Sequence, residues 1–172
     1  MGSVVLVIGG ARSGKTAFAL RRASEVSAGG GKLYIATAQP LDAEMEERID
    51  KHRKERGSLW ETCEEPIHPG HAVKAASRTH AVAVIDCLTL WLSNLLCGNM
   101  DIERARSELV DSLQDLGECH LFIVSNEVGL GLVPENEMAR RFRDEQGRLN
   151  QRVAECADEV YLMAAGIPVR IK

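Results

Sequence analysis

Residues 9–16 read Gly-Gly-Ala-Arg-Ser-Gly-Lys-Thr, which fits the pattern G-x-x-x-x-G-K-[ST] of a phosphate-binding loop. An apolar run precedes the loop over residues 4–8, and a stretch with helical character follows it over residues 16–26. A strand, a glycine-rich turn and a helix in this order are the context in which the pattern binds phosphate. A chance glycine turn is the alternative interpretation, and the motif together with its context argues against it. The segment therefore predicts a nucleotide-binding protein.

Each residue type in this loop has a physical role toward phosphate. Glycines allow the backbone to wrap so tightly that its N–H groups point at phosphate oxygens. The start of the following helix adds a partial positive charge. Lys15 is placed to reach the outer phosphates, and the hydroxyl of Thr16 is placed to bind Mg²⁺. The predicted nucleotide-binding set is Gly9, Gly10, Ala11, Arg12, Ser13, Gly14, Lys15 and Thr16.

Length and charge narrow the class of protein. The 172 residues predict a single domain over residues 1–172, long enough to bury a core without disulfides or metals. The formal net charge of −4 argues against nucleic-acid binding through a basic face. No apolar run is long enough to span a bilayer, and the N-terminus has no signal-peptide character. Five scattered cysteines without C-x-x-C spacing favour buried free thiols in a reducing compartment. We therefore expect a cytoplasmic protein.

Apolar runs alternate with helical patterns, which is the order expected of an α/β protein with a mostly parallel sheet. The runs that predict buried parallel strands lie at residues 4–8, 33–36, 81–85 and 121–125. Further helices are predicted over residues 42–56, 101–116 and 135–157.

Capping and breaking residues support these boundaries. Asp42 and Asp101 are the expected caps of the first two helices, Gly117 ends the second, and Gly147 is a candidate interruption of the third. Strands at residues 159–163 and 169–171 predict a terminal hairpin, which would add an antiparallel edge to the sheet.

Asp86 directly follows the third apolar run. Ligands of open α/β sheets bind at the carboxyl ends of strands, and an acidic residue there supplies the second Mg²⁺ contact of a phosphate-loop protein. A cap for the next helix is the alternative role. With the phosphate loop present, the Mg²⁺ role is favoured for Asp86, together with Thr16.

His52 lies on a predicted apolar stripe. Met45, Ile49 and His52 follow the spacing i, i+4, i+7, so they share one helix face, and His52 is expected to point inward. Such a histidine is more often a core residue than a catalyst. The neighbouring cations Arg53, Lys54 and Arg56 would attract nucleotide phosphates toward a nucleophilic imidazole, or they form a solvated helix end.

Three weaker signals remain. The pair His68 and His71 sits in a turn-like stretch and is interpreted as a surface loop rather than a metal site. Residues 125–131 follow a strand with a polar pair and glycines, which suits a substrate-holding loop. Residues 138–150 are rich in arginine, and one or two of these side chains suit contact with a phosphorylated substrate.

These pieces in this order resemble the bifunctional adenosylcobinamide kinase/adenosylcobinamide-phosphate guanylyltransferase family of cobalamin biosynthesis. The resemblance spans nearly the whole chain, and its most specific parts are R-I-x-x-H-R, N-E-V-G and F-R-D followed by G-x-x-N-Q. The matching segments are GGARSGKT (9–16), YIATAQ (34–39), DAEMEERIDKHR (42–53), WETCE (60–64), DCLTLWL (86–92), SNEVGLGLVP (125–134), ARRFRDEQGRLNQ (139–151) and ADEV (157–160).

The resemblance implies a P-loop NTPase fold with a RecA-like sheet, and a homotrimer with sites at subunit contacts. His52 resembles the histidine that takes up GMP covalently, and Lys15 is the second expected catalytic residue. Further positions match the lining of a GTP site: Ala36, Thr37, Ala38, Arg53, Lys54, Glu55, Arg56, Glu64 and Asp86.

The implied chemistry has two steps. ATP or GTP phosphorylates adenosylcobinamide, and GMP then passes from GTP through His52 to adenosylcobinamide phosphate, giving adenosylcobinamide-GDP. The expected cofactor is Mg²⁺, and the expected partner is the corrinoid substrate. Two rivals remain: a small-molecule kinase of the same fold without guanylyl transfer, and a non-catalytic nucleotide switch.

Overall fold

In the computed structural model, which describes residues 1–40 and 43–172 but no side chain at positions 44, 48 and 55, seven strands form one sheet. Their order across the sheet is β3-β2-β4-β5-β1-β6-β7. The strands are β1 (Val4–Gly9), β2 (Lys32–Ala36), β3 (Glu61–Glu64), β4 (Val82–Asp86), β5 (His120–Asn126), β6 (Glu159–Ala164) and β7 (Ile167–Arg170). All neighbouring pairs are parallel except β6 and β7. The predicted parallel sheet with an antiparallel edge near the C-terminus is confirmed.

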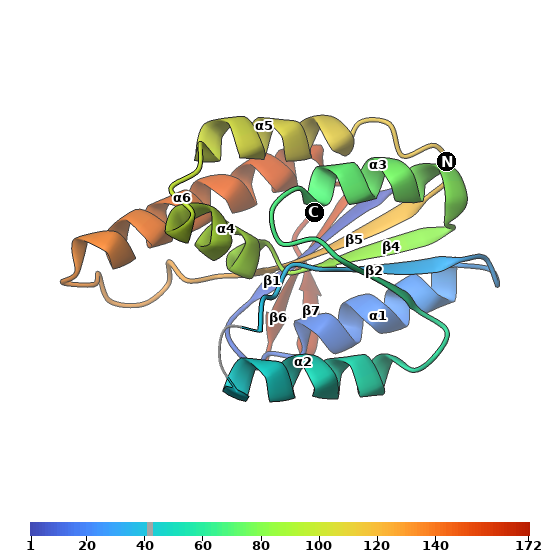
Figure 1. Cartoon of the computed structure of the whole chain (residues 1–172), viewed down its shortest axis with the longest axis horizontal. Coiled ribbons are helices and arrows are strands. Elements are labelled where there is room, and N and C mark those ends of the chain that lie inside the picture. The colour runs from blue at the N-terminus through green and yellow to red at the C-terminus, as the bar shows by residue number, and fades with distance from the viewer. Residues whose placement is uncertain (41–42) are drawn as a thin grey trace.

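Helices cover both faces of this sheet (Figure 1). One face carries α1 and α2, and the other carries α3, α4, α5 and α6. Their bounds are α1 (Lys15–Val26), α2 (Ala43–Arg56), α3 (Pro69–Thr79), α4 (Leu88–Cys97), α5 (Ile102–Ser112) and α6 (Glu137–Cys156).

Strand alternation divides the core into two layers, because successive side chains of a strand point to opposite faces. In β1, Leu6 packs toward α3–α6, whereas Val5 and Val7 pack toward α1. In β5, Leu121 and Ile123 face the layer beneath α3–α6, and Phe122 faces the layer beneath α1. Both faces of the central strands are buried, which is why their sequences read as continuous apolar runs.

The order of the strands brings separated segments to one edge. β5 lies between β1 and β4, and its last residue, Asn126, is in register with Gly9 of β1. On the other side of β5, Val124 is in register with Asp86 of β4. The phosphate-binding loop after β1, Asp86 and the segment after β5 therefore leave the sheet side by side at its carboxyl edge.

Several predicted boundaries need correction. β3 and α3 were not predicted, because β3 is four residues long and α3 is read as a loop around Pro69. α5 ends at Ser112, four residues before the predicted end, and Gly117, with a φ of 57°, belongs to the following turn. α6 runs through Gly147 without interruption.

The helix caps are partly confirmed. The side chain of Asp101 accepts a hydrogen bond from the backbone N–H of Arg104, as expected of the cap of α5. Asp42, the predicted cap of α2, lies outside the described residues. The cysteines are all free, and only Cys87 and Cys119 are buried, whereas Cys97 is exposed. The expectation of uniformly buried thiols is therefore wrong for Cys97, which ends α4 beside the turn at Gly98.

None of the helices over residues 1–40 and 43–172 combines the length and apolar character that crossing a bilayer requires.

The two-layer core makes a prediction about stability. Replacing the fully buried Leu121 with alanine should lower the free energy of unfolding by about 2–5 kcal/mol, because the surrounding side chains cannot fill the cavity completely. Leu59→Ala, at a side chain that is 76% exposed, should change it by less than about 0.5 kcal/mol. Urea denaturation of both variants measures the difference, and equal values would contradict the assigned core.

Candidate nucleotide-binding and catalytic site

The phosphate-binding loop occupies the turn between β1 and α1. Gly9 has a φ of 157°, and a Cβ there would lie 2.7 Å from the carbonyl oxygen of Met163, so only glycine fits. Gly14 has a φ of 89°, in the left-handed region that glycine adopts without strain. The turn between β6 and β7 closes on this loop, since Gly166 N–H donates to the carbonyl of Ser13 at 3.1 Å. The antiparallel hairpin thus supports the phosphate-binding loop from the side.

Lys15 is folded back into this loop. Its side chain is 8% exposed, and Nζ donates to the carbonyl oxygen of Gly10 and lies 3.4 Å from Oγ of Ser13. Burial lowers the pKa of Lys15 below its ordinary value, while Cys87 and Asp86 oppose that shift. A phosphate group in the loop would favour the charged form, because an opposite charge nearby stabilises the ammonium. The lysine is therefore positioned for an anion.

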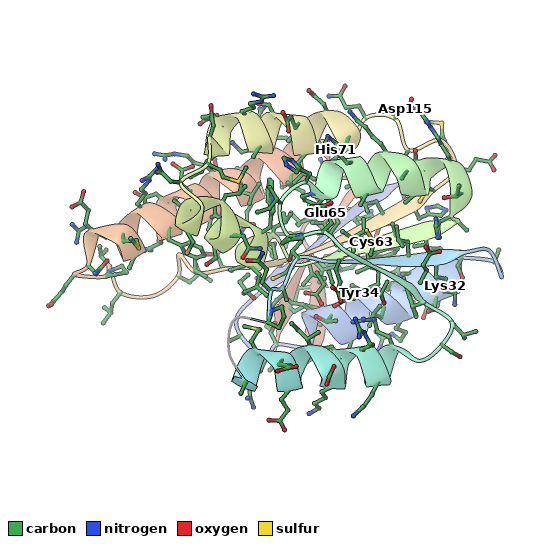
Figure 2. The ribbon with its side chains drawn as sticks, in the orientation of Figure 1. Lys32, Tyr34, Cys63, Glu65, His71 and Asp115 are labelled. Atoms are coloured by element: carbon green, nitrogen blue, oxygen red, sulfur yellow. The ribbon has the colours of Figure 1, made fainter. Side chains whose placement is uncertain are left out.

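Asp86 joins two elements at the carboxyl edge. Its Oδ2 accepts hydrogen bonds from the hydroxyl of Thr16, at 2.8 Å, and from the phenol of Tyr34, also at 2.8 Å. Burial raises the pKa of Tyr34, and the nearby Asp86 raises it further, so the phenol stays protonated and donates. Figure 2 shows Tyr34 on β2, and its side chain belongs to the core layer that faces α1. Asp86 makes none of the side-chain hydrogen bonds expected of a helix cap: for α4 the N-cap is Cys87.

The oxygens of Thr16 and Asp86 fit a magnesium ion. Mg²⁺ prefers hard oxygen ligands and is held by one or two protein groups together with substrate phosphates. The hydroxyl and the carboxylate meet at one point beside the phosphate-binding loop. Within the described ranges, no group of three or more His, Cys, Asp or Glu side chains is arranged to hold a metal by itself.

The segment after β2 is tied to the start of α4. Thr37 is fully buried; its hydroxyl accepts from Cys87 N–H at 2.8 Å and lies 2.7 Å from the carbonyl of Cys87. Asn94 donates to the carbonyl of Thr37 at 2.8 Å. Ala36 and Ala38, which flank Thr37, are half-buried. Thr37 therefore fixes the backbone beside Asp86.

Two arginines attach α2 to the sheet. Arg53 donates to Oε1 of Glu64 at 2.6 Å, and both side chains are more than half exposed. The guanidinium of Arg56 stacks over the ring of Tyr34, 3.6 Å from its centroid, and Nη2 donates to Thr62 at 3.3 Å. Nε of Arg56 is buried and has no hydrogen-bond partner among the described residues. A continuous chain of contacts therefore links α2 through Tyr34 and Asp86 to Thr16.

His52 does not point inward as predicted; its side chain is exposed on α2. The reason lies in the helix periodicity. Ile49, Arg53 and Arg56 follow the spacing i, i+4, i+7, and this is the face that the ion pair and the stacking contact turn toward the sheet. His52 lies to one side of that face, where a ligand can reach it. Lys54 is also exposed, and for Glu55 only the backbone, within α2, is described.

A buried polar cluster at the end of β5 was not predicted. Ser125 and Gln146 are fully buried; Ser125 donates to Asn150 at 2.7 Å, and Gln146 donates to both. Asn150 donates in turn to the carbonyl of Asn126 at 3.1 Å, and Thr89 accepts from Asn126 N–H at 2.9 Å. The sequence did contain a sign of this cluster: the amides Gln146 and Asn150 follow the spacing i, i+4 on the apolar face of α6.

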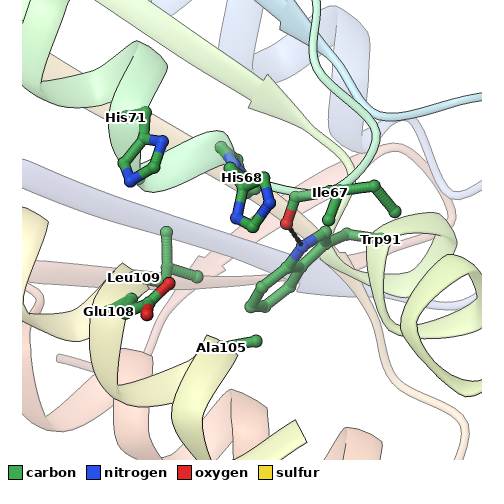
Figure 3. Close-up of a pocket in the computed structure, with 9 residues that line it drawn as sticks. Ile67, His68, His71, Trp91, Ala105, Glu108 and Leu109 are labelled. Atoms are coloured by element: carbon green, nitrogen blue, oxygen red, sulfur yellow. Dashed lines mark hydrogen bonds between the residues drawn. The ribbon is translucent and has the colours of Figure 1, made fainter. Parts of the chain in front are cut away.

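His68 is the N-cap of α3 and His71 lies in its first turn, so the pair is on the surface, as predicted, but at the start of a helix (Figure 3). Pro69 begins the helix, which suits its missing N–H. The two exposed imidazoles stack with ring centroids 5.2 Å apart, next to a shallow pocket lined by Trp91 and Glu108.

The other predicted substrate contacts, the arginines of α6 and the loop after β5, make hydrogen bonds within the protein. The arginines of α6 mainly contact the protein itself: Arg143 donates to the carbonyl of Gly129 at 2.6 Å, and Arg148 donates to Glu145 at 2.6 Å. The loop after β5 begins beside the phosphate-binding loop, where Glu127 N–H donates to the carbonyl of Gly9 at 3.0 Å. Its predicted role in holding substrate stays a prediction.

A glycine loop after β1, a buried lysine and an aspartate at the end of β4 define a phosphate-loop nucleotide-binding protein. The chain belongs to the cobinamide kinase / cobinamide phosphate guanyltransferase family, which matches it over residues 5–171. This membership confirms the resemblance inferred from the motifs and makes the chain a bifunctional enzyme of that kind.

Curated relatives match over nearly their full length. The bifunctional adenosylcobalamin biosynthesis protein CobP of Pseudomonas aeruginosa is 43% identical over 169 residues, covering 97% of this chain and 96% of the relative. Proteins named bifunctional adenosylcobalamin biosynthesis protein CobU, from Salmonella typhimurium and Escherichia coli K12, are 40% and 39% identical over 187 residues. Each of these alignments covers 98% of this chain and 99% of the relative.

Among solved structures, the ATPase domain of G40P is similar in fold, with a TM-score of 0.51 at 15% identity. The alignment covers 93% of this chain and 68% of that chain. At this identity the likeness shows the fold alone. Together with the sheet order, it confirms the predicted α/β fold class, a P-loop NTPase with a mostly parallel sheet flanked by helices.

The position of Asp86 predicts how the site responds to magnesium. Asp86→Asn keeps an acceptor oxygen for Tyr34 but removes the negative charge, so Mg²⁺-dependent binding of GTP should weaken at least about tenfold. The thermal midpoint should stay near that of the wild type. Calorimetric titration of GTP with and without Mg²⁺ measures the effect. An unchanged Mg²⁺ dependence with a large loss of stability would mean that Asp86 has a structural role only.

Proposed function

We propose that the chain carries out its two transfers with two sets of residues at the carboxyl edge of the sheet. The phosphate-binding loop, with Lys15 and Thr16, holds the nucleoside triphosphate whose γ-phosphoryl group goes to adenosylcobinamide. His52 on α2, with Arg53 and Arg56 on the same helix, takes GMP from GTP. The observation that supports the nucleotide site most directly is the contact between Thr16 and Asp86, beside the buried Lys15.

In the kinase step, a hydroxyl oxygen of adenosylcobinamide attacks the γ-phosphorus and loses its proton to solvent, while the bridging bond to the β-phosphate breaks and the nucleoside diphosphate leaves. Little covalent chemistry is required of the protein, so positioning and charge stabilisation dominate. Backbone N–H groups of residues 9–14 orient the phosphates, and Lys15 stabilises the charge on the outer oxygens. Thr16 and Asp86 would hold Mg²⁺, which neutralises phosphate charge when it is bound.

In the guanylyl step, a neutral imidazole nitrogen of His52 attacks the α-phosphorus of GTP and pyrophosphate leaves. The phosphate of adenosylcobinamide phosphate then attacks the GMP–histidine bond, which releases His52 and gives adenosylcobinamide-GDP. Splitting one displacement into two lowers each barrier. The exposure of His52 supports this role, because the side chain must be reached by both GTP and the acceptor. Arg53 and Arg56 add positive charge on the neighbouring face.

The proposal includes the remaining expectations about the protein's setting. GTP is the guanylyl donor, and either ATP or GTP serves the kinase step with Mg²⁺. The enzyme works in the cytoplasm as a homotrimer in which neighbouring subunits complete the sites. The oligomer rests on family resemblance, and sedimentation analysis of the purified chain tests it.

One experiment separates this function from a kinase without guanylyl transfer and from a non-catalytic switch. The protein is incubated with GTP labelled at the α or the γ position, denatured and examined for retained label. Retention of the α label alone supports the proposed two-step enzyme. Retention of neither label, with phosphorylation of adenosylcobinamide, indicates a simple kinase. Nucleotide binding without any turnover indicates a switch.

The buried lysine predicts a large kinetic effect. Lys15→Met keeps the length of the side chain but removes the charge that faces the phosphates, so kinase turnover should fall about 10²–10³-fold. Lys74→Met, at an exposed lysine on α3, is the matched control and should have normal turnover. Initial rates of adenosylcobinamide phosphorylation measure both. Near-normal turnover in the Lys15 variant would remove this residue from the catalytic site.

His52→Asn predicts a selective defect. The variant keeps a polar side chain of similar size but lacks the nucleophilic nitrogen, so it should retain no α label from GTP and form no adenosylcobinamide-GDP. Kinase activity should persist, because residues 9–16 are unchanged. In the wild type the adduct should break in acid and survive mild alkali, as a phosphoramidate does. His71→Asn, at an exposed histidine of α3, should label normally. Labelling of the His52 variant would assign the nucleophile to another residue.

A further inference from the structure

The segment between β5 and α6, residues 127–136, combines a fixed backbone with exposed apolar side chains. Leu130, Leu132 and Val133 are 84%, 95% and 65% exposed, and Met138 in the first turn of α6 is 73% exposed. We call these four residues the apolar loop surface. Figure 1 shows the segment projecting from the sheet between β5 and α6.

The segment begins after Asn126, whose backbone N–H and carbonyl are both hydrogen-bonded. Thr89 of α4 accepts from the N–H of Asn126, and Asn150 of α6 donates to its carbonyl. Asn150 is in turn fixed by the fully buried Ser125 and Gln146. One acceptor of this cluster, Oε1 of Gln146, has no hydrogen-bond partner among the described residues, whereas both backbone groups of Asn126 are paired. The segment therefore leaves the sheet in one direction.

Hydrogen bonds also fix the segment further along. Glu127 accepts from Gly129 N–H at 2.6 Å, and Arg143 of α6 donates to the carbonyl of Gly129 at 2.6 Å. Arg140 donates to the carbonyls of Pro134 and Glu135. Backbone carbonyls take these arginine contacts, while the leucine and valine side chains point into solvent. Fixing a backbone lowers the entropy that a ligand must offset when it binds, so this arrangement suits a recognition surface.

The place of the segment indicates what it contacts. It starts beside the phosphate-binding loop, because Glu127 N–H donates to the carbonyl of Gly9 and β5 is the neighbour of β1. A molecule that accepts a phosphoryl group from a nucleotide on that loop must approach at the same edge. If the acceptor is a corrinoid, its large ring carries methyl groups among polar amide side chains, and the accepting hydroxyl lies on a flexible arm.

Resting on the proposed function, we propose that the apolar loop surface binds the corrin ring of the acceptor and directs its arm to the nucleotide. Contact with a second copy of the chain is the alternative occupant, and the sedimentation measurement below distinguishes it from the corrinoid.

The test removes the apolar character without touching the nucleotide site. The double variant Leu130→Ser/Leu132→Ser should bind adenosylcobinamide about 10- to 100-fold more weakly in equilibrium dialysis, and KM for the corrinoid should rise by a similar factor. GTP binding and α-label retention should equal those of the wild type. The conservative Leu130→Met/Leu132→Met variant should restore corrinoid binding. The matched control Val169→Ser/Ile171→Ser, at exposed apolar side chains in and just after the edge strand β7, should bind normally.

Each result has a defined meaning. Wild-type corrinoid affinity in the serine variant would overturn the inference and leave the proposed function intact. Failure of the wild type to bind any corrinoid would overturn both. A change in sedimentation of the serine variant with unchanged corrinoid affinity would assign the surface to contact between copies of the chain. Loss of GTP binding together with corrinoid binding would show that the segment acts through the fold and would also overturn the inference.

Discussion

The hydrogen bond between Thr16 and Asp86 is the contact on which the arrangement of the site depends. It joins the first turn of α1 to the end of β4, which are far apart in sequence. In the sheet, β5 separates β4 from β1, the strand that precedes α1. Tyr34 adds a third element by donating to the same oxygen. A carboxylate that accepts two hydrogen bonds has a defined position, so a metal ion and phosphates would meet preorganised ligands. The core layers on both faces hold these strands in place and thereby fix the positions of the residues at their carboxyl ends.

Local sequence patterns predicted most of the secondary structure around this contact. The phosphate-binding loop, the four central strands and the terminal hairpin were predicted from apolar runs and glycines, because each is encoded within a few neighbouring residues. The four-residue β3 was missed because it is too short to show a periodicity, and the 11-residue α3 was missed because the residues around Pro69 are typical of a turn. The partners of Asp86 depend on strand order, which no local window contains.

The prediction that His52 points inward is wrong for a physical reason. An apolar stripe of two residues does not fix which face of a helix turns inward, and α2 is otherwise strongly polar. Two long cationic side chains decide the orientation: Arg56 covers the ring of Tyr34, and Arg53 pairs with Glu64. Arginine can bury its stem and its planar head against an aromatic ring, which a count of apolar residues does not register. The same orientation exposes His52, as the proposed role in covalent transfer requires.

The two arginines of α2 differ in what they can offer a nucleotide. The pair formed by Arg53 and Glu64 is more than half exposed on both sides, and such pairs contribute only about 0.2–1 kcal/mol. Breaking the pair of Arg53 and Glu64 therefore costs little stability. Arg56 is held by its stacking on Tyr34 and retains one buried Nε–H without a partner among the described residues. Arg56 is thus the fixed attachment of α2 and Arg53 the exchangeable one, so the link from α2 through Tyr34 to Asp86 does not depend on the pair of Arg53 and Glu64.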